Sequence, residues 1–160
     1  MSGKAFFKNR YSKLGWVFQE TGPRQAIRIN RTRIKDCDLL ERLEKAGATL
    51  EKVPFLENGH WVQNSKVSVG ATAEYLLGLY SIQEAAAQIP TTLFSNIKDK
   101  LVLDACAAPG GKTVQLADLM DNSGTVVALD ISKQRLKALS NHLERCHVSN
   151  TVVYKRDART

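Results

Sequence analysis

The chain has 160 residues, of which 43% are hydrophobic, so it is long enough for one ordinary domain or two small ones with a real core. Its three cysteines form no CxxC pair and have no paired histidine spacing, which argues against a disulfide framework or a zinc site and favours a reduced, cytoplasmic compartment. The start is polar and interrupted by charge, unlike a signal peptide, and no apolar run approaches the roughly 18 residues of a membrane span. We therefore expect no membrane partner.

Positive charge concentrates at the N-terminus. The first 35 residues hold nine basic residues against one acid, whereas the other 125 carry 14 basic and 15 acidic residues. Five aromatic residues are interleaved with this charge: Phe6, Phe7, Tyr11, Trp16 and Phe18. Basic and stacking side chains together suit RNA with exposed bases. A solvated basic face over an ordinary aromatic core is the open alternative.

The first half predicts a small α+β unit, placed at residues 1–69. Residues 26–30 (AIRIN) alternate like a short strand, and a helix is expected from the capping-box pair Asp38 and Glu41 to Gly47. Residues 50–53 and 60–69 read as further strands around turn signals. We expect this unit to bind RNA through its basic side chains: Arg24, Arg28, Arg31, Arg33 and Lys35.

A different pattern starts near residue 70. Ser81 and Glu84 predict a capped helix over IQEAAAQ that ends at Pro90. Strands are then predicted at 101–105, 125–129 and 152–154, with a helix after each of the first two. Such alternation indicates βαβ units with right-handed crossovers on a parallel sheet, so residues 70–160 are predicted to be an α/β domain.

The stretch DACAAPGGKT, from Asp104 to Thr113, lies at the carboxyl end of the first of these strands, where α/β sheets bind ligands. Gly110 and Gly111 allow close approach of the backbone to a ligand, and the next helix offers free N–H groups to a carboxylate, with Lys112 as an added charge. Acids also follow the next two strands. Asp130 is placed to accept ribose hydroxyls, and Asp157 to meet an adenine amino group.

Three other interpretations of this loop fit the residues less well. A dinucleotide site requires GxGxxG, which is not present here. A phosphate-binding P-loop requires GxxxxGK[ST], but the residue five positions before Gly111 is Cys106. An ordinary strand-to-helix turn needs neither a paired glycine after proline nor acids at both following strand ends.

The motif CAAPGGKT after an apolar strand resembles the cofactor loop of the Sun-type (nucleolar-protein/Sun) RNA (cytosine-5) methyltransferases. The same family resemblance extends over residues 24–160 through YSIQEA before Pro90, Asp130 with Arg135, RDAR at 156–159, and Arg28 with Asn30. It implies a Rossmann-like domain that binds S-adenosylmethionine, preceded by a small RNA-binding domain. By position, the implied cofactor residues are Cys106, Ala107, Ala108, Pro109, Gly110, Gly111, Lys112, Asp130, Arg135 and Asp157.

The family's chemistry uses a cysteine thiolate that attacks C6 of cytosine, and a second cysteine that releases the product. Both follow the third strand in the family, so the resemblance implies a nucleophile beyond Thr160, the last residue given. We therefore expect Cys37, Cys106 and Cys146 to have packing or loop roles and the 160 residues alone to be inactive. A non-catalytic cofactor- and RNA-binding module, or half of a split enzyme, is the alternative. The compact N-terminal region favours tRNA over ribosomal RNA as the substrate.

The resemblance also has a consequence for association. The family's first strand is central in its sheet, but residues 101–105 are expected to form an exposed apolar edge here. We therefore expect poor stability, and either self-association through this strand or a complementing chain.

Overall fold

The computed structural model describes residues 3–17 and 22–159, so Phe18, Glu20 and Thr160 lie outside the described residues. The elements in chain order are α1 (Gly3–Lys13), β1 (Ala26–Ile29), α2 (Asp36–Lys45), β2 (Ala48–Lys52), β3 (Gly59–Ser65), η1 (Val69–Ala71), α3 (Ala73–Leu76), β4 (Tyr80–Ile82), α4 (Ala85–Thr92), β5 (Leu101–Asp104), α5 (Gly111–Leu119), β6 (Thr125–Asp130), α6 (Lys133–Arg145) and β7 (Thr151–Lys155). No helix among the described residues is long and apolar enough to cross a membrane.

The first sheet is antiparallel, with the strand order β2-β3-β1-β4. Its inner strand β1 is buried along its whole length. Ile27 and Ile29 pack with Leu39 and Leu43 of α2, which form that helix's apolar stripe. Because side chains alternate along a strand, Ala26 and Arg28 face the other side of the sheet.

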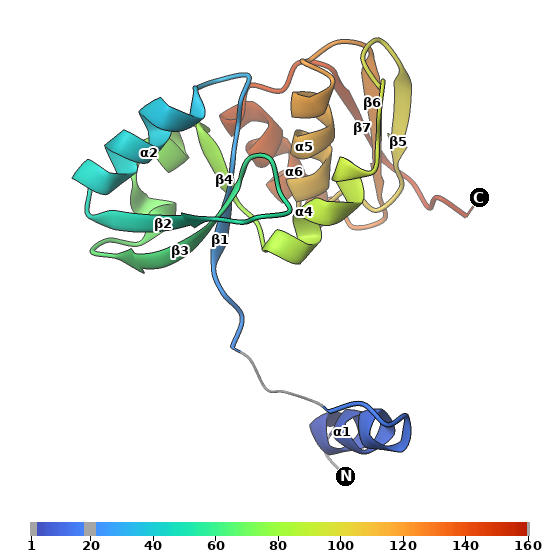
Figure 1. The fold of residues 1–160 in the computed structure, drawn as a ribbon. Coiled ribbons are helices and arrows are strands. Elements are labelled where there is room, and N and C mark those ends of the chain that lie inside the picture. The colour runs from blue at the N-terminus through green and yellow to red at the C-terminus, as the bar shows by residue number, and fades with distance from the viewer. Residues whose placement is uncertain (1–2, 18–21, 160) are drawn as a thin grey trace.

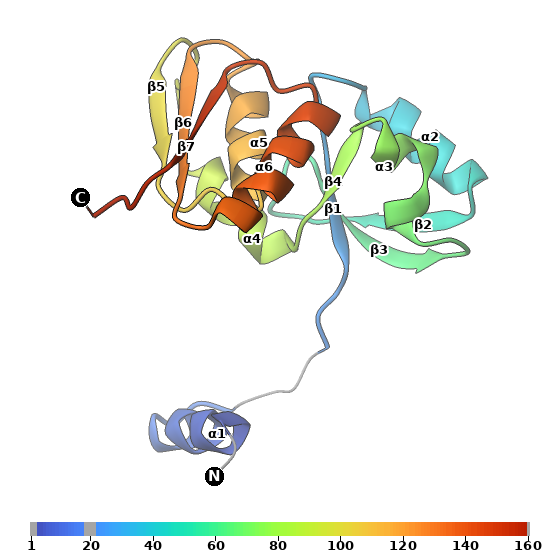
Figure 2. The ribbon, with the colours of Figure 1, turned by 180° about the vertical axis from the view of Figure 1, so that it is seen from behind.

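The second sheet is parallel, with the order β5-β6-β7. The alternation of strand and helix is as the sequence predicts. Val102 and Val126 pack against Leu116 and Met120 on the α5 side of the sheet. Figures 1 and 2 show α5 and α6 lying between the two sheets, so that one face of the second sheet is covered by helices.

The opposite face of the second sheet is not covered by any described element (Figure 2). Leu101 and Leu103 of β5 are 76% and 59% exposed, and Val152 and Tyr154 of β7 are also exposed. Strand β5 lies at the edge of this sheet, as expected for residues 101–105 of this chain.

Two differences from the sequence-based expectations concern the junction between the halves. Residues 80–82 form a strand that pairs with β1, and the helix starts only at Ala85 and contains Pro90. The predicted capped helix over IQEAAAQ is therefore wrong in its start and its end. Sheet pairing to β1 holds Tyr80–Ile82 extended, and the first sheet runs beyond residue 70, where the second region was expected to begin. Helix α2 also starts earlier, at Asp36, and its N-cap residue Lys35 makes no side-chain capping bond.

Helix α1 was not predicted, and both views show it apart from the rest of the protein. Its aromatic residues do not form a core, since Phe6, Phe7, Tyr11 and Trp16 are all exposed. Phe6 packs edge-on against Phe7, and Tyr11 packs against Trp16, in each case with ring centroids 5.6 Å apart. The alternative of an ordinary aromatic core is therefore wrong for these four residues.

Candidate cofactor site

The loop between β5 and α5 is shaped by bonds at its two ends. The Thr113 hydroxyl donates to Asp104 Oδ2 at 2.8 Å, and the Cys106 N–H donates to Asp104 Oδ1 at 3.3 Å. Gly110, which caps α5, has a φ of +106°, and a Cβ there would lie 2.8 Å from Leu139 Cδ1. The backbone conformation thus requires glycine at this position, and any larger residue would also displace the Leu139 side chain of α6.

Asp130 and Arg135 fasten the middle of the loop to β6 and α6. The Ala108 N–H donates to Asp130 Oδ2 at 3.3 Å, and the Ser132 N–H donates to Oδ1 at 2.9 Å. Arg135 Nη1 lies 3.4 Å from Asp130 Oδ2, and its Nη2 donates to the Ala108 carbonyl. The Asp130 carboxylate is nearly buried, but its two oxygens have about four acceptor positions, which leaves capacity for a ligand hydroxyl.

A hollow of about 360 Å³ opens at the carboxyl ends of the parallel strands. It is lined by Ala105, Cys106, Asp130, Ile131, Arg135, Asp157, Ala158 and Arg159. The Asp157 carboxylate accepts hydrogen bonds from Arg159 Nε at 3.0 Å and Nη2 at 2.6 Å, and these bonds lower the pKa of Asp157. We call this hollow the cofactor pocket; its volume falls in the range of small-ligand sites.

The structure brings together four of the ten predicted cofactor residues, Cys106, Asp130, Arg135 and Asp157, in the lining of the cofactor pocket. Ala107, Ala108 and Gly110 are buried in the loop, whereas Pro109 and Lys112 are exposed; none of these five, nor Gly111, is in the lining. Sequence reasoning missed Ala105, Ile131, Ala158 and Arg159, which also line the pocket. Ala105, Ile131 and Ala158 each adjoin a predicted residue, and Ala158 and Arg159 belong to the RDAR motif at 156–159, so adjacency and that motif were the available signals.

The structure does not test the nucleophile that the family resemblance implies. Its expected position, beyond Thr160, lies outside the described residues, which end at Arg159. The lining of the cofactor pocket reaches that last described residue. The prediction of a nucleophile beyond Thr160 therefore stays a prediction.

His142, a residue with no predicted role, links the cofactor loop to the first sheet by hydrogen bonds to both. His142 Nδ1 lies 3.3 Å from the Pro109 carbonyl, and Nε2 lies 2.9 Å from Ser81 Oγ of β4. Because a carbonyl only accepts, Nδ1 carries the proton and Ser81 donates to Nε2. Burial, together with the charges of Arg145 and Arg28, lowers the pKa of His142 to about 4. Behind Gly111, a Cβ would lie 3.4 Å from Gln83 Cδ, so β4 and its following residue support both glycines.

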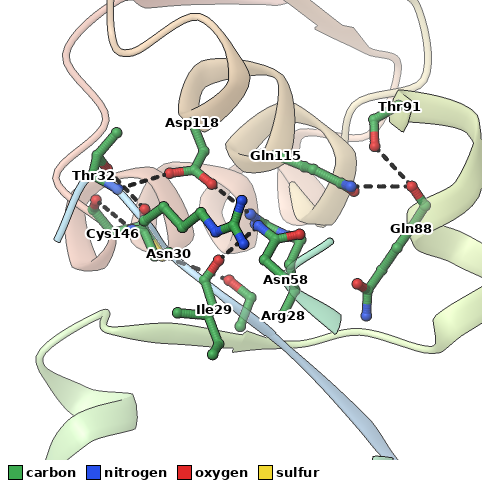
Figure 3. A network of polar contacts seen from close by, with 12 residues as sticks. Arg28, Ile29, Asn30, Thr32, Asn58, Gln88, Thr91, Gln115, Asp118 and Cys146 are labelled. Atoms are coloured by element: carbon green, nitrogen blue, oxygen red, sulfur yellow. Dashed lines mark hydrogen bonds and ion pairs between the residues drawn. The ribbon is translucent and has the colours of Figure 1, made fainter. Parts of the chain in front are cut away.

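Arg28 is not an RNA-binding residue in this structure, contrary to the prediction, because its side chain is 0% exposed. Its guanidinium points from the first sheet toward α5 (Figure 3), where Nη1 lies 3.5 Å from Asp118 Oδ2, and Nε donates to Gln83 Oε1 at 3.1 Å. Burial lowers the pKa of Arg28, and the nearby Asp118 carboxylate opposes that shift. Asn30 makes a parallel contact, donating to the Cys146 carbonyl at 3.2 Å.

The remaining predicted RNA residues lie at two separate places. Arg31, Arg33 and Lys35 are exposed in the loop after β1, which is fixed to the C-terminal end of α5 by the Thr32 N–H donating to Asp118 Oδ1 at 3.0 Å. Arg31 there pairs with Asp36 at 3.0 Å and with Glu57. The cofactor loop leads into the N-terminal end of α5. The two ends of this nine-residue helix are about 13 Å apart. Arg24, before β1, stacks on Trp61 and pairs with Glu51.

Among the described residues, no group of three or more histidine, cysteine or acidic side chains is placed to hold a metal ion. The ligand that this geometry fits is an organic one with hydroxyl and amino donors for Asp130 and Asp157. The glycine-bounded loop and the free end of α5 suit a carboxylate.

Comparisons with known proteins agree with this geometry. Residues 3–85 match the family described as the N-terminal domain of 16S rRNA methyltransferase RsmF, and residues 91–160 match the 16S rRNA methyltransferase RsmB/F family. The ribosomal RNA small subunit methyltransferase F of Aeromonas hydrophila is 42% identical over 142 residues, and that of Vibrio cholerae is 40% identical over 138. These matches cover 85% and 84% of this chain, but only 30% and 29% of the relatives.

Solved structures show the same architecture. A methyltransferase homologue from Pyrococcus horikoshii is 33% identical, with a TM-score of 0.82 over 86% of this chain and 45% of its own. NSun6 from the same organism, solved with SFG, is 18% identical and shares the fold, with a TM-score of 0.80 over 99% of this chain and 63% of its own. The chain thus spans about 30% of the length of its curated relatives. It belongs to the RsmF family of Sun-type RNA methyltransferases, whose cofactor is S-adenosylmethionine.

Proposed function

We propose that this protein takes part in transferring a methyl group from S-adenosylmethionine to C5 of a cytosine in small-subunit ribosomal RNA. The observation that carries the proposal is the cofactor pocket, in which the CAAPGGKT loop and the acids Asp130 and Asp157 meet at the carboxyl ends of three parallel strands. The names of the relatives, ribosomal RNA small subunit methyltransferase F, favour ribosomal RNA over the tRNA expected from the sequence.

The residues of this chain would hold the cofactor in a defined way. Asp130 would accept the ribose hydroxyls and Asp157 the adenine amino group, while the N–H groups at the start of α5 would face the carboxylate. Arg135 would act through the loop, because its guanidinium holds the Ala108 carbonyl and the Asp130 carboxylate. The cofactor supplies an electrophilic methyl group on a sulfonium centre.

Cytosine C5 is a weak nucleophile until a thiolate adds at C6, and the three cysteines here are poorly placed for that step. Cys146 is buried, with its Sγ 3.8 Å from Ser81 Oγ. Cys37 lies on α2, whereas Cys106 is part of the cofactor loop and lines its pocket. We propose that these 160 residues bind the cofactor and that the nucleophile belongs to a part of the whole enzyme beyond Thr160.

Calorimetry with S-adenosylmethionine and S-adenosylhomocysteine tests the cofactor assignment. Asp130→Ala is expected to weaken binding by about 1.5–3 kcal/mol, the scale of a lost charge-assisted hydrogen bond. Asp38→Ala, on the exposed start of α2, is the matched control and should leave binding unchanged. Equal affinities for the wild type and Asp130→Ala would show that Asp130 does not contact the cofactor. Binding of NAD in place of S-adenosylhomocysteine would contradict the assignment of S-adenosylmethionine as the cofactor.

A transfer assay tests the division of labour. Small-subunit ribosomal RNA lacking the modification is incubated with the 160-residue chain and cofactor carrying a labelled methyl group. No label should enter the RNA even when calorimetry shows the cofactor bound. Incorporation by this chain alone would show that one of its own cysteines, or another route, supplies the covalent step.

A further inference from the structure

A second hollow, of about 530 Å³, lies on the first unit where the chain enters β1. It is lined by Gly22, Pro23, Arg24, Trp61, Glu84, Ala85 and Ala86. These residues come from the segment before β1, from β3, and from the start of α4. We call it the Arg24–Trp61 hollow, and it shares no lining residue with the cofactor pocket.

Its walls present aromatic and cationic surface together. The Arg24 guanidinium carbon lies 4.0 Å from the centre of the Trp61 ring. Phe55, which is 59% exposed, packs edge-on against Trp61 with centroids 6.2 Å apart. Arg24 also pairs with Glu51, but both side chains are 46% exposed, and an exposed pair of this kind holds the guanidinium only weakly.

The hollow is connected to the cofactor loop through one residue next to its lining. Gln83, the residue before Glu84 in its lining, packs against Gly111 at the start of α5. In Figures 1 and 2, the first residues of α4, the entry to β1 and the carboxyl ends of β5–β7 all lie on the lower side of the molecule. The basic loop with Arg31 lies on the upper side, beside the far end of α5.

The N-terminal part of the chain, which precedes the hollow, carries charge complementary to RNA. Helix α1 has the sequence GKAFFKNRYSK, with four basic residues and no acid, and its aromatic side chains are exposed. Stacking on aromatic rings and contact of phosphates with basic groups are two of the interactions by which proteins bind unpaired RNA.

We propose that the Arg24–Trp61 hollow binds an unpaired segment of the RNA substrate, with one base stacked on the Trp61 ring in the place that the Arg24 guanidinium occupies here, and Arg24 turned to a phosphate. The inference rests on the proposed function for the identity of the substrate, and adds where and in which state the RNA is bound. A stacked base here would hold single-stranded RNA beside the cofactor loop.

Tryptophan fluorescence tests this directly, because the chain has two tryptophans, Trp16 and Trp61. In the 160-residue chain with Trp16→Phe, Trp61 is the only reporter. Single-stranded RNA of about ten nucleotides should quench its emission saturably. The matching duplex RNA, inorganic polyphosphate and an acidic peptide should not, since none offers an unpaired base to stack.

Variants separate stacking from charge. In anisotropy titrations of dye-labelled single-stranded RNA, Trp61→Ala should weaken binding roughly 5- to 100-fold with an unchanged salt slope, and Trp61→Phe should restore most of it. Arg24→Ala should lower the slope of log affinity against log salt by about one. Circular dichroism and cofactor calorimetry on each variant show whether the fold is intact.

Quenching by polyphosphate or the acidic peptide as strong as by RNA would overturn the stacking proposal, as would full RNA affinity in a folded Trp61→Ala variant. If that happens while S-adenosylmethionine still binds, only this inference fails. If RNA quenches Trp61 but no cofactor binds, the proposed function fails and the stacking surface stands.

Discussion

Two strands of similar apolar composition, one in each sheet, differ in how far they are buried. The strand β1 (AIRI) is buried along its whole length, whereas β5 (LVLD) leaves Leu101 and Leu103 exposed. Both strands are rich in apolar residues, so composition does not distinguish them. The difference lies in their neighbours: β1 has a strand on each side and α2 over one face, while among the described residues β5 has one neighbouring strand and helices on one face only. The apolar sequence of a strand indicates that it is suited to burial. Whether the strand is in fact buried depends on the strands and helices next to it.

The contact between the first sheet and the α5–α6 layer is unlike the core of either. The first sheet is sealed by aliphatic packing and the α5–α6 layer by its own clusters, but the two meet through Arg28, Gln83, Asn30 and Asp118. Figure 3 shows how polar side chains, among them Arg28, Asn30 and Asp118, converge between the layers. The largest expected effect comes from breaking this junction.

Asp118→Ala should lower the free energy of unfolding by about 3–5 kcal/mol, because it leaves the buried Arg28 guanidinium without its counter-charge. Neither Nη atom of Arg28 has a hydrogen-bond partner among the described residues, so the ion pair with Asp118 is the polar contact that these atoms would lose. Urea unfolding measures the change. Asp38→Ala, on the exposed start of α2, is the control.

Adding Arg28→Met to Asp118→Ala should recover part of the loss, since the buried charge is removed as well. A single Asp118→Ala variant as stable as the wild type would show that the junction is held by packing alone. In that case the ion pair between Arg28 and Asp118 would not be what holds the first sheet and the α5–α6 layer together.

The His142 contact predicts that stability depends on pH. The pKa of His142 falls from its ordinary 6.5 to about 4 on folding, so the unfolded chain binds more protons between these values. The stabilisation is therefore present above about pH 6.5 and is lost as the pH falls toward 4. The difference amounts to at most about 3 kcal/mol.

His142→Asn keeps a donor for the Pro109 carbonyl but does not titrate. Urea unfolding from about pH 4 to about pH 7 should show a shallower pH dependence for this variant than for the wild type. His147→Asn, an exposed position just beyond the end of α6, is the control and should follow the wild type. Parallel curves for all three proteins would mean that His142 stays solvated and does not support the cofactor loop.

The open face of the second sheet predicts self-association. Leu101→Thr with Leu103→Thr should reduce it, seen in sedimentation as a shift toward monomer, at a cost below about 1 kcal/mol in unfolding free energy because both side chains are largely exposed. Val102→Thr lies between them but is buried at 7% exposure, so it should destabilise the fold without changing association. A wild-type chain that sediments as a monomer at high concentration would contradict the expectation.

Local pattern predicted much of this structure. The parallel strands, the glycine loop and the position of Asp130 follow from alternating apolar runs and the residues that end them. Strand β4 was missed because its three residues precede an alanine-rich helical run, and its pairing with β1 depends on a segment far away in the chain. Arg28 was misplaced because a charged side chain is usually exposed, and its partner Asp118 lies on α5. His142 received no role because its two partners, Ser81 and Pro109, are brought together only by the fold.

The smallest expected effect is on the salt dependence of RNA binding, and it tests which end of α5 the RNA contacts. The sequence predicts that Arg31→Ala with Arg33→Ala flattens the salt dependence of RNA binding. The structure gives a reason to expect little, because Arg31 is shared between two carboxylates, Asp36 and Glu57, where Arg24 pairs with Glu51 alone, and because its loop lies at the end of α5 away from the cofactor loop. The double variant should therefore change the slope of log affinity against log salt by less than the loss of about one expected for Arg24→Ala alone.

Binding of single-stranded RNA titrated between low and moderate salt measures both slopes, with cofactor calorimetry as the check on folding. A double variant that flattens the slope by about two, one for each lost phosphate contact, would place phosphates at both ends of α5. The RNA would then have to run over the first sheet from the Arg31 loop to the Arg24–Trp61 hollow, and the upper side would belong to the binding surface too.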